Sequence, residues 1–101
     1  MRKQVYSEKY LERKLVAQIK GLKGECIKLL STHLTGLPDR LCLLPEGVAV
    51  FAEIKTTGEK PRRIQEVIHN RLRSIGFRVY IVDTDEALQK LIQDVKREQP
   101  T

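Results

Sequence analysis

The sequence predicts an α/β fold in which helices flank a mixed central sheet, and three observations lead to this prediction. Apolar residues recur at helical spacing near the start, the middle and the end of the chain. Short runs rich in β-branched residues lie between these segments, and two of the runs are joined by a three-residue turn. A hairpin makes antiparallel neighbours, whereas a strand, a crossover helix and a further strand make parallel ones. We therefore expect the element order αβββαβα.

The first helix is expected from Ser7 to about Leu22. Serine is a preferred N-cap residue, and the segment presents one apolar face, formed by Leu11, Leu15, Ile19 and Leu22. Residues 25–30 are predicted as a strand. Residues 31–38 are predicted as a loop, because glycine and proline interrupt regular structure there.

A hairpin and a second helix follow. The hairpin strands are predicted at residues 40–44 and 48–55, joined by the turn Pro45-Glu46-Gly47. After a polar loop, Pro61 suits the first position of a helix that runs to Ile75. The apolar face of this helix is expected to comprise Ile64, Val67, Ile68, Leu72 and Ile75.

The chain is expected to end with a strand at residues 77–82 and a last helix. Asp83 and Glu86 resemble a capping box at the start of that helix. Its apolar face should comprise Ala87, Leu88, Leu91, Ile92 and Val95. Residues 98–101 are expected to fray.

Length and composition favour one globular domain. The chain has 101 residues, and we expect a single domain over residues 1–101 with its core at about 7–96. No apolar run approaches a membrane span and no signal peptide is evident, so the expected location is the cytoplasm. Cys26 and Cys42 lack metal-binding spacing, so we expect two reduced, buried thiols rather than a zinc site.

The net charge of +6 favours a polyanionic partner, although many proteins that never bind nucleic acid carry a similar charge. With no Trp and few aromatic residues, contacts to phosphates are expected rather than base stacking. The candidate contact residues around the middle helix are Lys60, Arg62, Arg63, Arg71 and Arg73. A charged helix face needs no ligand, however. His33 and His69 are isolated in the sequence, and we expect both at the surface.

Two charges at the end of an apolar strand are the first sign of a functional site. Because side chains alternate along a strand, Glu53 and Lys55 share one face with Ala49 and Phe51. Both faces are apolar for most of the length, which is typical of a central strand covered on both sides. A buried carboxylate is unfavourable unless it is paired or bound to a metal. A salt bridge at the rim of the sheet would satisfy Glu53 and Lys55 taken alone.

Asp39 changes this interpretation. It precedes the neighbouring hairpin strand, so pairing across the turn would bring it to the same end of the sheet as Glu53. Two adjacent carboxylates repel each other. Lys55 would offset this repulsion, and a hard divalent cation such as Mg²⁺ would offset it more.

At this point the residues resemble a known family. Pro38-Asp39, thirteen further residues and then Glu53-Ile54-Lys55 resemble the PD-(D/E)xK nuclease pattern. The wider string resembles the virus-type replication-repair nuclease (VRR-NUC) domain, and it comprises residues 36–40, residues 51–55, Gln65 and residues 74–79. The resemblance extends from about residue 12 to residue 82, and it implies a restriction-endonuclease-like core.

The resemblance implies a role for each matching residue. Asp39, Glu53 and the backbone carbonyl of Ile54 would hold Mg²⁺ or Mn²⁺, and Lys55 would orient or activate the attacking water. Gln65 would support the site.

Two further positions carry implied roles. Glu12 would complete the metal shell or hold a metal-bound water, and Lys28 would lie near the phosphate. Periodicity alone is equally consistent with Gln65 as a solvent-facing residue and with Glu12 as part of a solvated helix face. The resemblance also implies a homodimer that nicks DNA or cuts it structure-selectively, on branched or supercoiled substrates.

Two other hypotheses stay open at this stage. The chain could be a non-catalytic nucleic-acid-binding module in which Glu53 and Lys55 form a structural ion pair. The joint presence of Asp39, Glu53, Lys55 and Gln65 argues against this, since a binding module needs none of them. An RNA-directed nuclease is the third hypothesis, because charge and motif do not separate DNA from RNA.

Overall fold

The computed structural model describes residues 4–30 and 32–98, and it confirms the predicted order of elements. These elements are α1 (Glu8–Gly21), β1 (Glu25–Lys28), β2 (Arg40–Leu44), β3 (Val48–Ile54), α2 (Arg63–Ser74), β4 (Arg78–Val82) and α3 (Asp85–Glu98). The turn between β2 and β3 is a short 3-10 helix, η1 (Pro45–Gly47). Ser31 and the last three residues of the tail expected to fray lie outside the described residues. No described helix has both the length and the apolar character to cross a bilayer.

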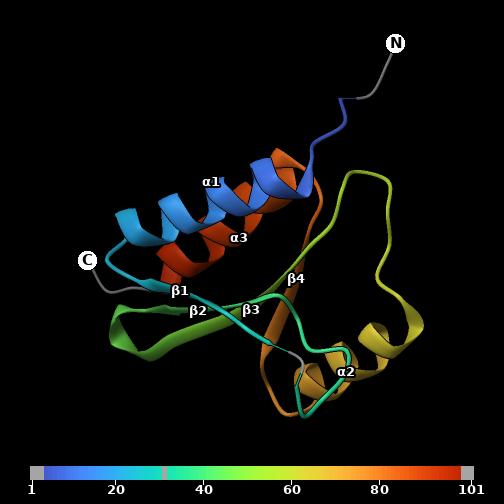
Figure 1. Cartoon of the computed structure of the whole chain (residues 1–101). Helices are drawn as coiled ribbons and strands as arrows, with labels where there is room; N and C mark the ends of the chain where they lie inside the picture. Colours follow the sequence, from blue (N-terminus) through green and yellow to red (C-terminus); the bar gives the residue numbers. More distant parts are fainter. Residues whose placement is uncertain (1–3, 31, 99–101) are drawn as a thin grey trace.

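The four strands form one mixed sheet in the order β1-β2-β3-β4, as the predicted fold class requires. The pairs β1–β2 and β2–β3 are antiparallel, and β3–β4 is parallel because α2 makes the crossover (Figure 1). Arg40 is paired with Ala52 in the β2–β3 register. The residue before β2 therefore lies beside the end of β3, which is the geometry that the hairpin predicted.

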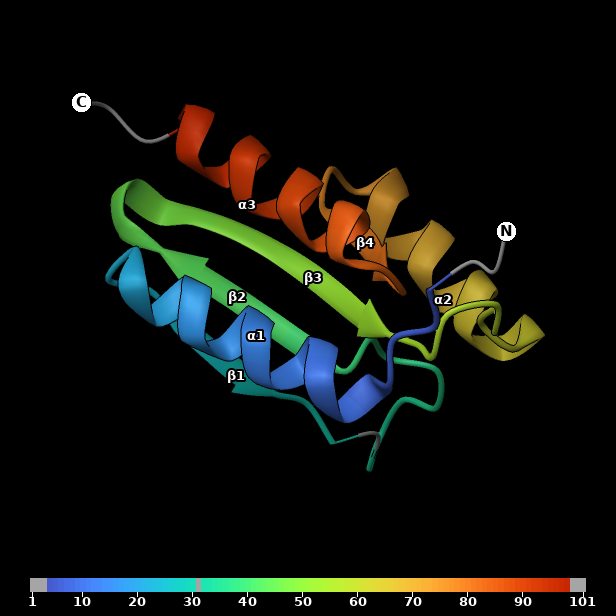
Figure 2. The ribbon, with the colours of Figure 1, turned by 90° about the horizontal axis from the view of Figure 1, so that it is seen from above.

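One face of the sheet is covered by α1 and α3, which lie side by side along it (Figure 2). The apolar faces predicted for these helices form most of the core, with Leu11, Leu15, Ile19, Leu88, Leu91, Ile92 and Val95 all buried. The strand β3 adds Val50, Ala52 and Ile54 from its facing side. Burial of this apolar set from both helices and the sheet is the main source of stability in such a layer.

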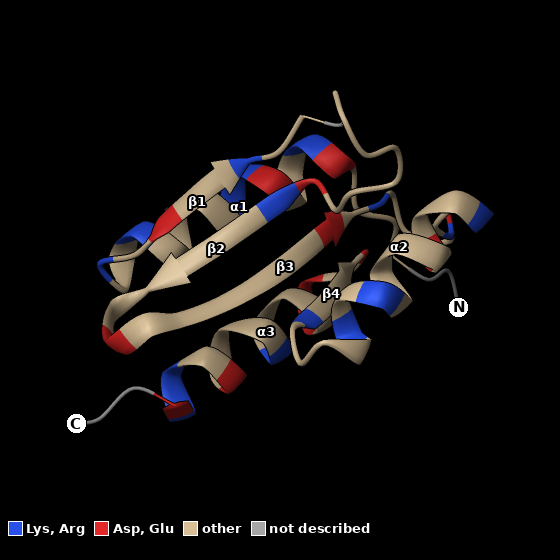
Figure 3. Ribbon diagram, turned by 90° about the horizontal axis from the view of Figure 1, so that it is seen from below, with Lys and Arg blue, Asp and Glu red and all other residues tan. Residues whose placement is uncertain are grey.

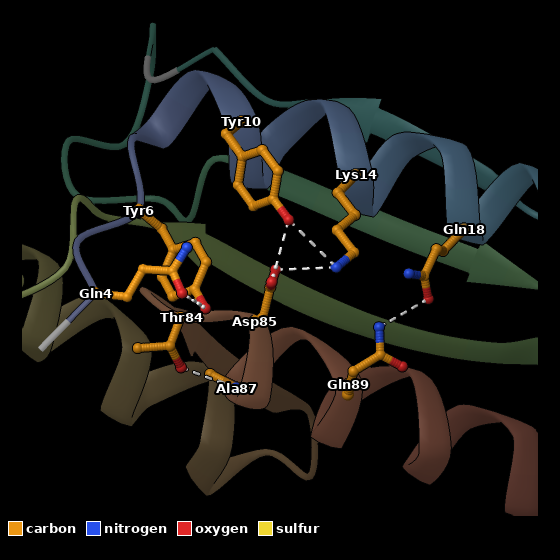
Figure 4. Close-up of polar contacts among 9 residues, drawn as sticks. All are labelled: Gln4, Tyr6, Tyr10, Lys14, Gln18, Thr84, Asp85, Ala87 and Gln89. Atoms are coloured by element: carbon orange, nitrogen blue, oxygen red, sulfur yellow. Dashed lines mark hydrogen bonds and ion pairs between the residues drawn. The ribbon is translucent and has the colours of Figure 1, made fainter.

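Polar contacts join α1 to α3 above this core (Figure 4). The Tyr10 hydroxyl donates to Asp85 Oδ2 at 3.1 Å, and Lys14 Nζ forms an ion pair with Asp85 Oδ1 at 3.0 Å. Further along, Gln89 Nε2 donates to Gln18 Oε1 at 3.3 Å. These contacts fix the two helices against each other at the surface of the layer.

The N-cap residue of α1 is the one predicted from the sequence, whereas the N-cap residue of α3 is not. Ser7 Oγ accepts the Tyr10 N–H at 3.1 Å, as predicted. At α3 the capping residue is Thr84, whose Oγ1 accepts the Ala87 N–H at 3.0 Å. The prediction of Asp83 as the cap was therefore wrong by one residue. Asp83 instead follows β4 directly, and its carbonyl accepts a hydrogen bond from Thr57 Oγ1 at 2.6 Å.

The other face of the sheet is covered only at the carboxyl end of β3, by α2. Figure 3 shows this face as broad and largely uncharged, with charged residues gathered where β3 ends and β2 begins. Glu53 is 1% exposed, whereas Phe51 on the same face is half-buried and packs edge-on against Phe77. The prediction that β3 is central was correct. The prediction that both of its faces are covered holds only at this end, because α2 is too short to span the sheet.

The helix α2 departs from its predicted start and its predicted face. It begins at Arg63 rather than at Pro61, because the Arg62 N–H is bound by the Gln65 side chain and Arg62 keeps an extended backbone. Ile64, Val67 and Ile75 were predicted to be buried, yet they are 41%, 45% and 69% exposed. The buried residues are Gln65, Ile68 and His69. The helix is thus rotated about its axis so that polar groups meet the end of β3.

Two smaller predictions were also corrected. The strand β1 ends at Lys28 rather than at residue 30, although the Leu29 N–H still donates to the Asp39 carbonyl at 2.8 Å. Both cysteines are free, with Cys26 opposite Cys42 in the β1–β2 register and their sulfurs 4.0 Å apart. Cys42 is buried as expected, but Cys26 is only half-buried because β1 is an edge strand.

Candidate active site

Glu53 is the centre of the polar cluster at the carboxyl end of β3. Its Oε2 atom accepts a hydrogen bond from Gln65 Nε2 at 2.8 Å and lies 3.2 Å from Lys55 Nζ. Its Oε1 atom is buried and has no hydrogen-bond partner among the described residues. A buried carboxylate oxygen without a donor is unfavourable. The site therefore keeps one oxygen of Glu53 free at a cost in stability.

Asp39 lies beside Glu53, at the position that the hairpin register predicted. Its Oδ2 atom accepts the Ile54 N–H at 2.8 Å, which ties the residue before β2 to the last residue of β3. The preceding loop reaches this position through Gly36, whose φ is +97°. A Cβ at Gly36 would lie 2.7 Å from the Ile64 carbonyl oxygen, so only glycine lets the loop pass this close to α2.

The electrostatics of the pair follow from this geometry. Burial raises the pKa of the Glu53 carboxyl, and the nearby charge of Asp39 raises it further. Hydrogen bonds from Lys55 and Gln65 lower the pKa but offset only part of that rise. The ionised form of Glu53 is therefore held at some expense, and an additional positive charge at the site would stabilise it.

Gln65 links α2 to this carboxylate. Its Nε2 donates to Glu53, while its Oε1 accepts the Arg62 N–H at 2.8 Å and so caps α2. With both ends of the amide engaged and only 6% of the residue exposed, the side chain has a fixed orientation. The alternative of a solvent-facing Gln65 is wrong.

Lys55 follows β3 directly and is held by its backbone. Its N–H donates to the Val82 carbonyl at 3.0 Å, which extends the β3–β4 pairing by one residue. Two residues later, Thr57 Oγ1 accepts the Tyr6 N–H at 2.8 Å and donates to the Asp83 carbonyl. The N-terminal segment and the end of β4 thus fix the loop that carries Lys55.

Glu12 and Lys28 lie apart from the two carboxylates. Glu12 Oε2 forms a salt bridge with Arg40, at 3.1 Å from both Nε and Nη2 of the guanidinium. Arg40 also donates to the Cys26 carbonyl, so the pair joins α1 to β1 and β2. Lys28 is exposed at the end of β1, opposite Arg40 in the register. The structure brings neither residue into the hydrogen bonds around Glu53.

The predicted phosphate-contacting residues around α2 are exposed, and they differ in whether other residues bind their side chains. Lys60, Arg62, Arg63 and Arg71 form no ion pair within residues 4–30 and 32–98. Arg73 is held in place, since its Nη2 donates to the Val79 carbonyl at 2.7 Å. Its guanidinium is thus partly committed to β4.

His69 was predicted at the surface, and this prediction was wrong. It is 1% exposed, and its Nε2 lies 3.8 Å from Glu53 Oε1. Helical spacing carried a signal for this, because residues four apart lie on one face of a helix and His69 follows Gln65 by four. His33, in contrast, is exposed as predicted.

The donor set fits a hard divalent cation. Within the described residues, no three His, Cys, Asp or Glu side chains gather closely enough to hold an ion by themselves. Mg²⁺ needs no such cage, since proteins usually bind it through one or two carboxylates and leave several waters in place. Asp39 and Glu53 are two such carboxylates, and Glu53 Oε1 is an acceptor that lacks a donor.

Comparisons with known proteins agree with this fold. No family model matches the chain. Its sequence is 37% identical over 79 residues to "Putative nuclease p44" of Acyrthosiphon pisum secondary endosymbiont phage 1, a match that covers 78% of this chain and 85% of that protein. A solved structure described as "VRR_NUC domain" superposes with a TM-score of 0.81 at 30% identity, covering 87% of this chain and 97% of the other. Both matches span most of the chain, so they concern the whole fold rather than one motif.

Proposed function

Because this chain belongs to the VRR-NUC family of the PD-(D/E)xK nucleases, we propose that it is a metal-dependent DNA endonuclease. In this proposal, residues 1–101 act as one nuclease domain, and Asp39, Glu53 and Lys55 form the catalytic centre. The reaction is phosphodiester hydrolysis: water adds to phosphorus, one P–O ester bond breaks, and a phosphate monoester and a hydroxyl are formed.

The observation that carries the proposal is the arrangement around Glu53. A carboxylate that is 1% exposed, has a raised pKa and keeps one oxygen without a donor weakens the fold rather than strengthening it. Strongly perturbed carboxylates of this kind cluster at functional sites. A structural ion pair with Lys55 would not require Asp39 and Gln65 at the same end of the sheet.

The residues would divide the chemistry between them. Asp39, Glu53 and the Ile54 carbonyl would hold Mg²⁺ or Mn²⁺, which supplies a Lewis acid and lowers the pKa of bound water. Lys55 would orient the attacking water and balance charge on the phosphate. Gln65 would keep Glu53 in place through the hydrogen bond already described.

The substrate side of the proposal is DNA, contacted through phosphates. The net charge of +6 and the exposed basic residues near α2 support this choice. We place the enzyme in the cytoplasm of a prokaryotic or phage-infected cell, where such DNA is found. One site cuts one strand, so a two-fold homodimer would address both strands of a branched substrate. Sedimentation equilibrium together with cleavage of a four-way junction and a matched linear duplex would test both points.

The first experiment is a plasmid-nicking assay. Supercoiled plasmid is incubated with the protein and Mg²⁺ or Mn²⁺, and the conversion to nicked circle is measured. We expect nicking that EDTA abolishes and that Lys55→Ala lowers by at least about 10²-fold, the scale of losing a charge-stabilising group. Lys96→Ala is the matched control, since Lys96 is exposed on α3. A folded protein that binds DNA but nicks with neither metal would favour the binding-module hypothesis.

A further inference from the structure

Two buried polar atoms face each other on the α2 side of Glu53. Glu53 Oε1 and His69 Nε2 are both without a hydrogen-bond partner within the described residues, and they lie 3.8 Å apart. Both residues are 1% exposed, so bulk water does not compensate either atom. Unpartnered buried polar atoms are rare in proteins, and a facing pair of them calls for an explanation.

The geometry indicates which ring nitrogen of His69 carries a proton. A neutral imidazole carries its proton on one nitrogen, and an imidazolium carries a proton on both. With a lone pair on Nε2, two acceptors would face each other across a dry gap, so the proton belongs on Nε2, pointing at Glu53.

The remaining acceptor sites of Glu53 can then be counted. A carboxylate offers about four lone-pair sites on its two oxygens. Gln65 and Lys55 occupy the two sites of Oε2. A hydrogen bond from His69 would occupy one site of Oε1 and would leave one acceptor site on that oxygen open.

We propose that His69 is a positioning residue whose Nε2–H donates to Glu53 Oε1 and limits this carboxylate to single-oxygen binding of the cation. A separation of 3.8 Å is too long for a hydrogen bond, so this contact would shorten to hydrogen-bond distance in the loaded site. Hydrogen bonds in active sites are often long until the site is loaded. This inference rests on the proposed metal-dependent function and deepens it.

The first test measures metal binding without DNA. Binding of Mn²⁺ to wild type, His69→Leu and His69→Gln is followed by the loss of the free Mn²⁺ signal in electron paramagnetic resonance. We expect His69→Leu to weaken binding by about 10- to 100-fold, as is typical when a partner of a metal ligand is lost. His69→Gln retains an N–H donor at similar reach and should restore most of the affinity. His33→Leu is the matched control, because His33 is exposed.

The second test locates the imidazole proton. The chain has only two histidines, so ¹⁵N spectra of the imidazole nitrogens can be assigned with a His33→Gln variant. We expect Nε2 of His69 to carry a proton. A purely structural role would leave the Mn²⁺ affinity of folded His69→Leu unchanged, even if its melting temperature fell.

The outcomes separate the two proposals. If wild type binds no Mn²⁺, the metal-dependent function fails and the His69 role fails with it. If wild type binds Mn²⁺ and folded His69→Leu binds it equally well, or if the proton is on Nδ1 alone, only the His69 role is overturned. Should His69→Leu not fold, His69→Asn replaces it, because the asparagine amide is too short to reach Glu53. Its affinity should then fall below that of His69→Gln, and equal affinities would contradict the proposal.

Discussion

The two faces of the central sheet bury different kinds of side chain, although both include the strand β3. On the α1–α3 face, Val50, Ala52 and Ile54 pack into an apolar layer. On the α2 face, the same strand buries Glu53, which has a raised pKa and an oxygen without a donor. Alternation along one strand is enough to separate the two environments.

This difference indicates a division of labour within the sheet. The apolar face supplies stability, since each of its side chains loses contact with water on folding. The α2 face uses part of that stability to hold a carboxylate in an unfavourable place. Substitutions on the apolar face should therefore lower the free energy of unfolding, whereas substitutions at the carboxylate on the α2 face should lower nicking activity.

The largest effect is expected from Glu53→Gln. It should lower the nicking rate by about 10³-fold or more, because the proposed metal ligand is lost. The free energy of unfolding should stay the same or rise, because a buried charge is removed.

The pH dependence of this variant gives a second check on its stability. Since the folded-state pKa of Glu53 is raised above the ordinary 4.5, the contribution of Glu53 to stability falls as pH rises from 4.5 through that pKa. Urea unfolding between pH 4 and pH 8 should therefore show the free energy of unfolding of wild type falling relative to that of Glu53→Gln as pH rises. A variant that is clearly less stable than wild type at pH 7 would mean that Glu53 is a structural residue.

The next effect concerns the apolar face. Leu91→Ala should lower the free energy of unfolding by about 2–5 kcal/mol, because Leu91 is fully buried and its truncation leaves a cavity. The nicking rate per folded molecule should be unchanged. Ile75→Ala, at the C-cap of α2, is the matched control, and its effect should stay within about 0.5 kcal/mol, since Ile75 is 69% exposed. Urea denaturation measures both. Comparable losses for the two variants would mean that a partner covers the C-terminal end of α2.

The smallest effect is expected where β4 meets α3. The Tyr80 hydroxyl donates to Asp94 Oδ2 at 2.8 Å, and burial together with this hydrogen bond raises the pKa of Tyr80 to about 12. Tyr80→Phe should lower the free energy of unfolding by about 1 kcal/mol at neutral pH.

The sign of the pH effect at Tyr80 follows from its raised pKa. The contribution of the neutral phenol is complete below pH 10, the ordinary value, and is lost as pH rises through 12. Unfolding at pH 8 and pH 11 should therefore show the wild-type advantage over Tyr80→Phe shrinking at the higher pH. An advantage that grew with pH would contradict this assignment.

Local patterns in the sequence were sufficient for most of the fold. The spacing of Leu11, Leu15 and Ile19 identified the buried face of α1, and the turn at Pro45 identified the hairpin. The register of that hairpin follows from the short turn, and it places Asp39 beside Glu53. Periodicity failed at α2, because the apolar pattern of a short helix does not specify which side meets the sheet when a polar group there requires partners.

The sequence alone determined the order of elements, the faces of α1 and α3 and the convergence of Asp39, Glu53 and Lys55, since these follow from period, turn chemistry and strand alternation. Only the tertiary structure decided the rotation of α2, which turns Gln65 and His69 inward and exposes Ile64 and Val67. It also decided that Glu12 pairs with Arg40. The reason is physical: a buried carboxylate selects its neighbours by hydrogen bonding across the fold, and no local pattern records which helix will supply them.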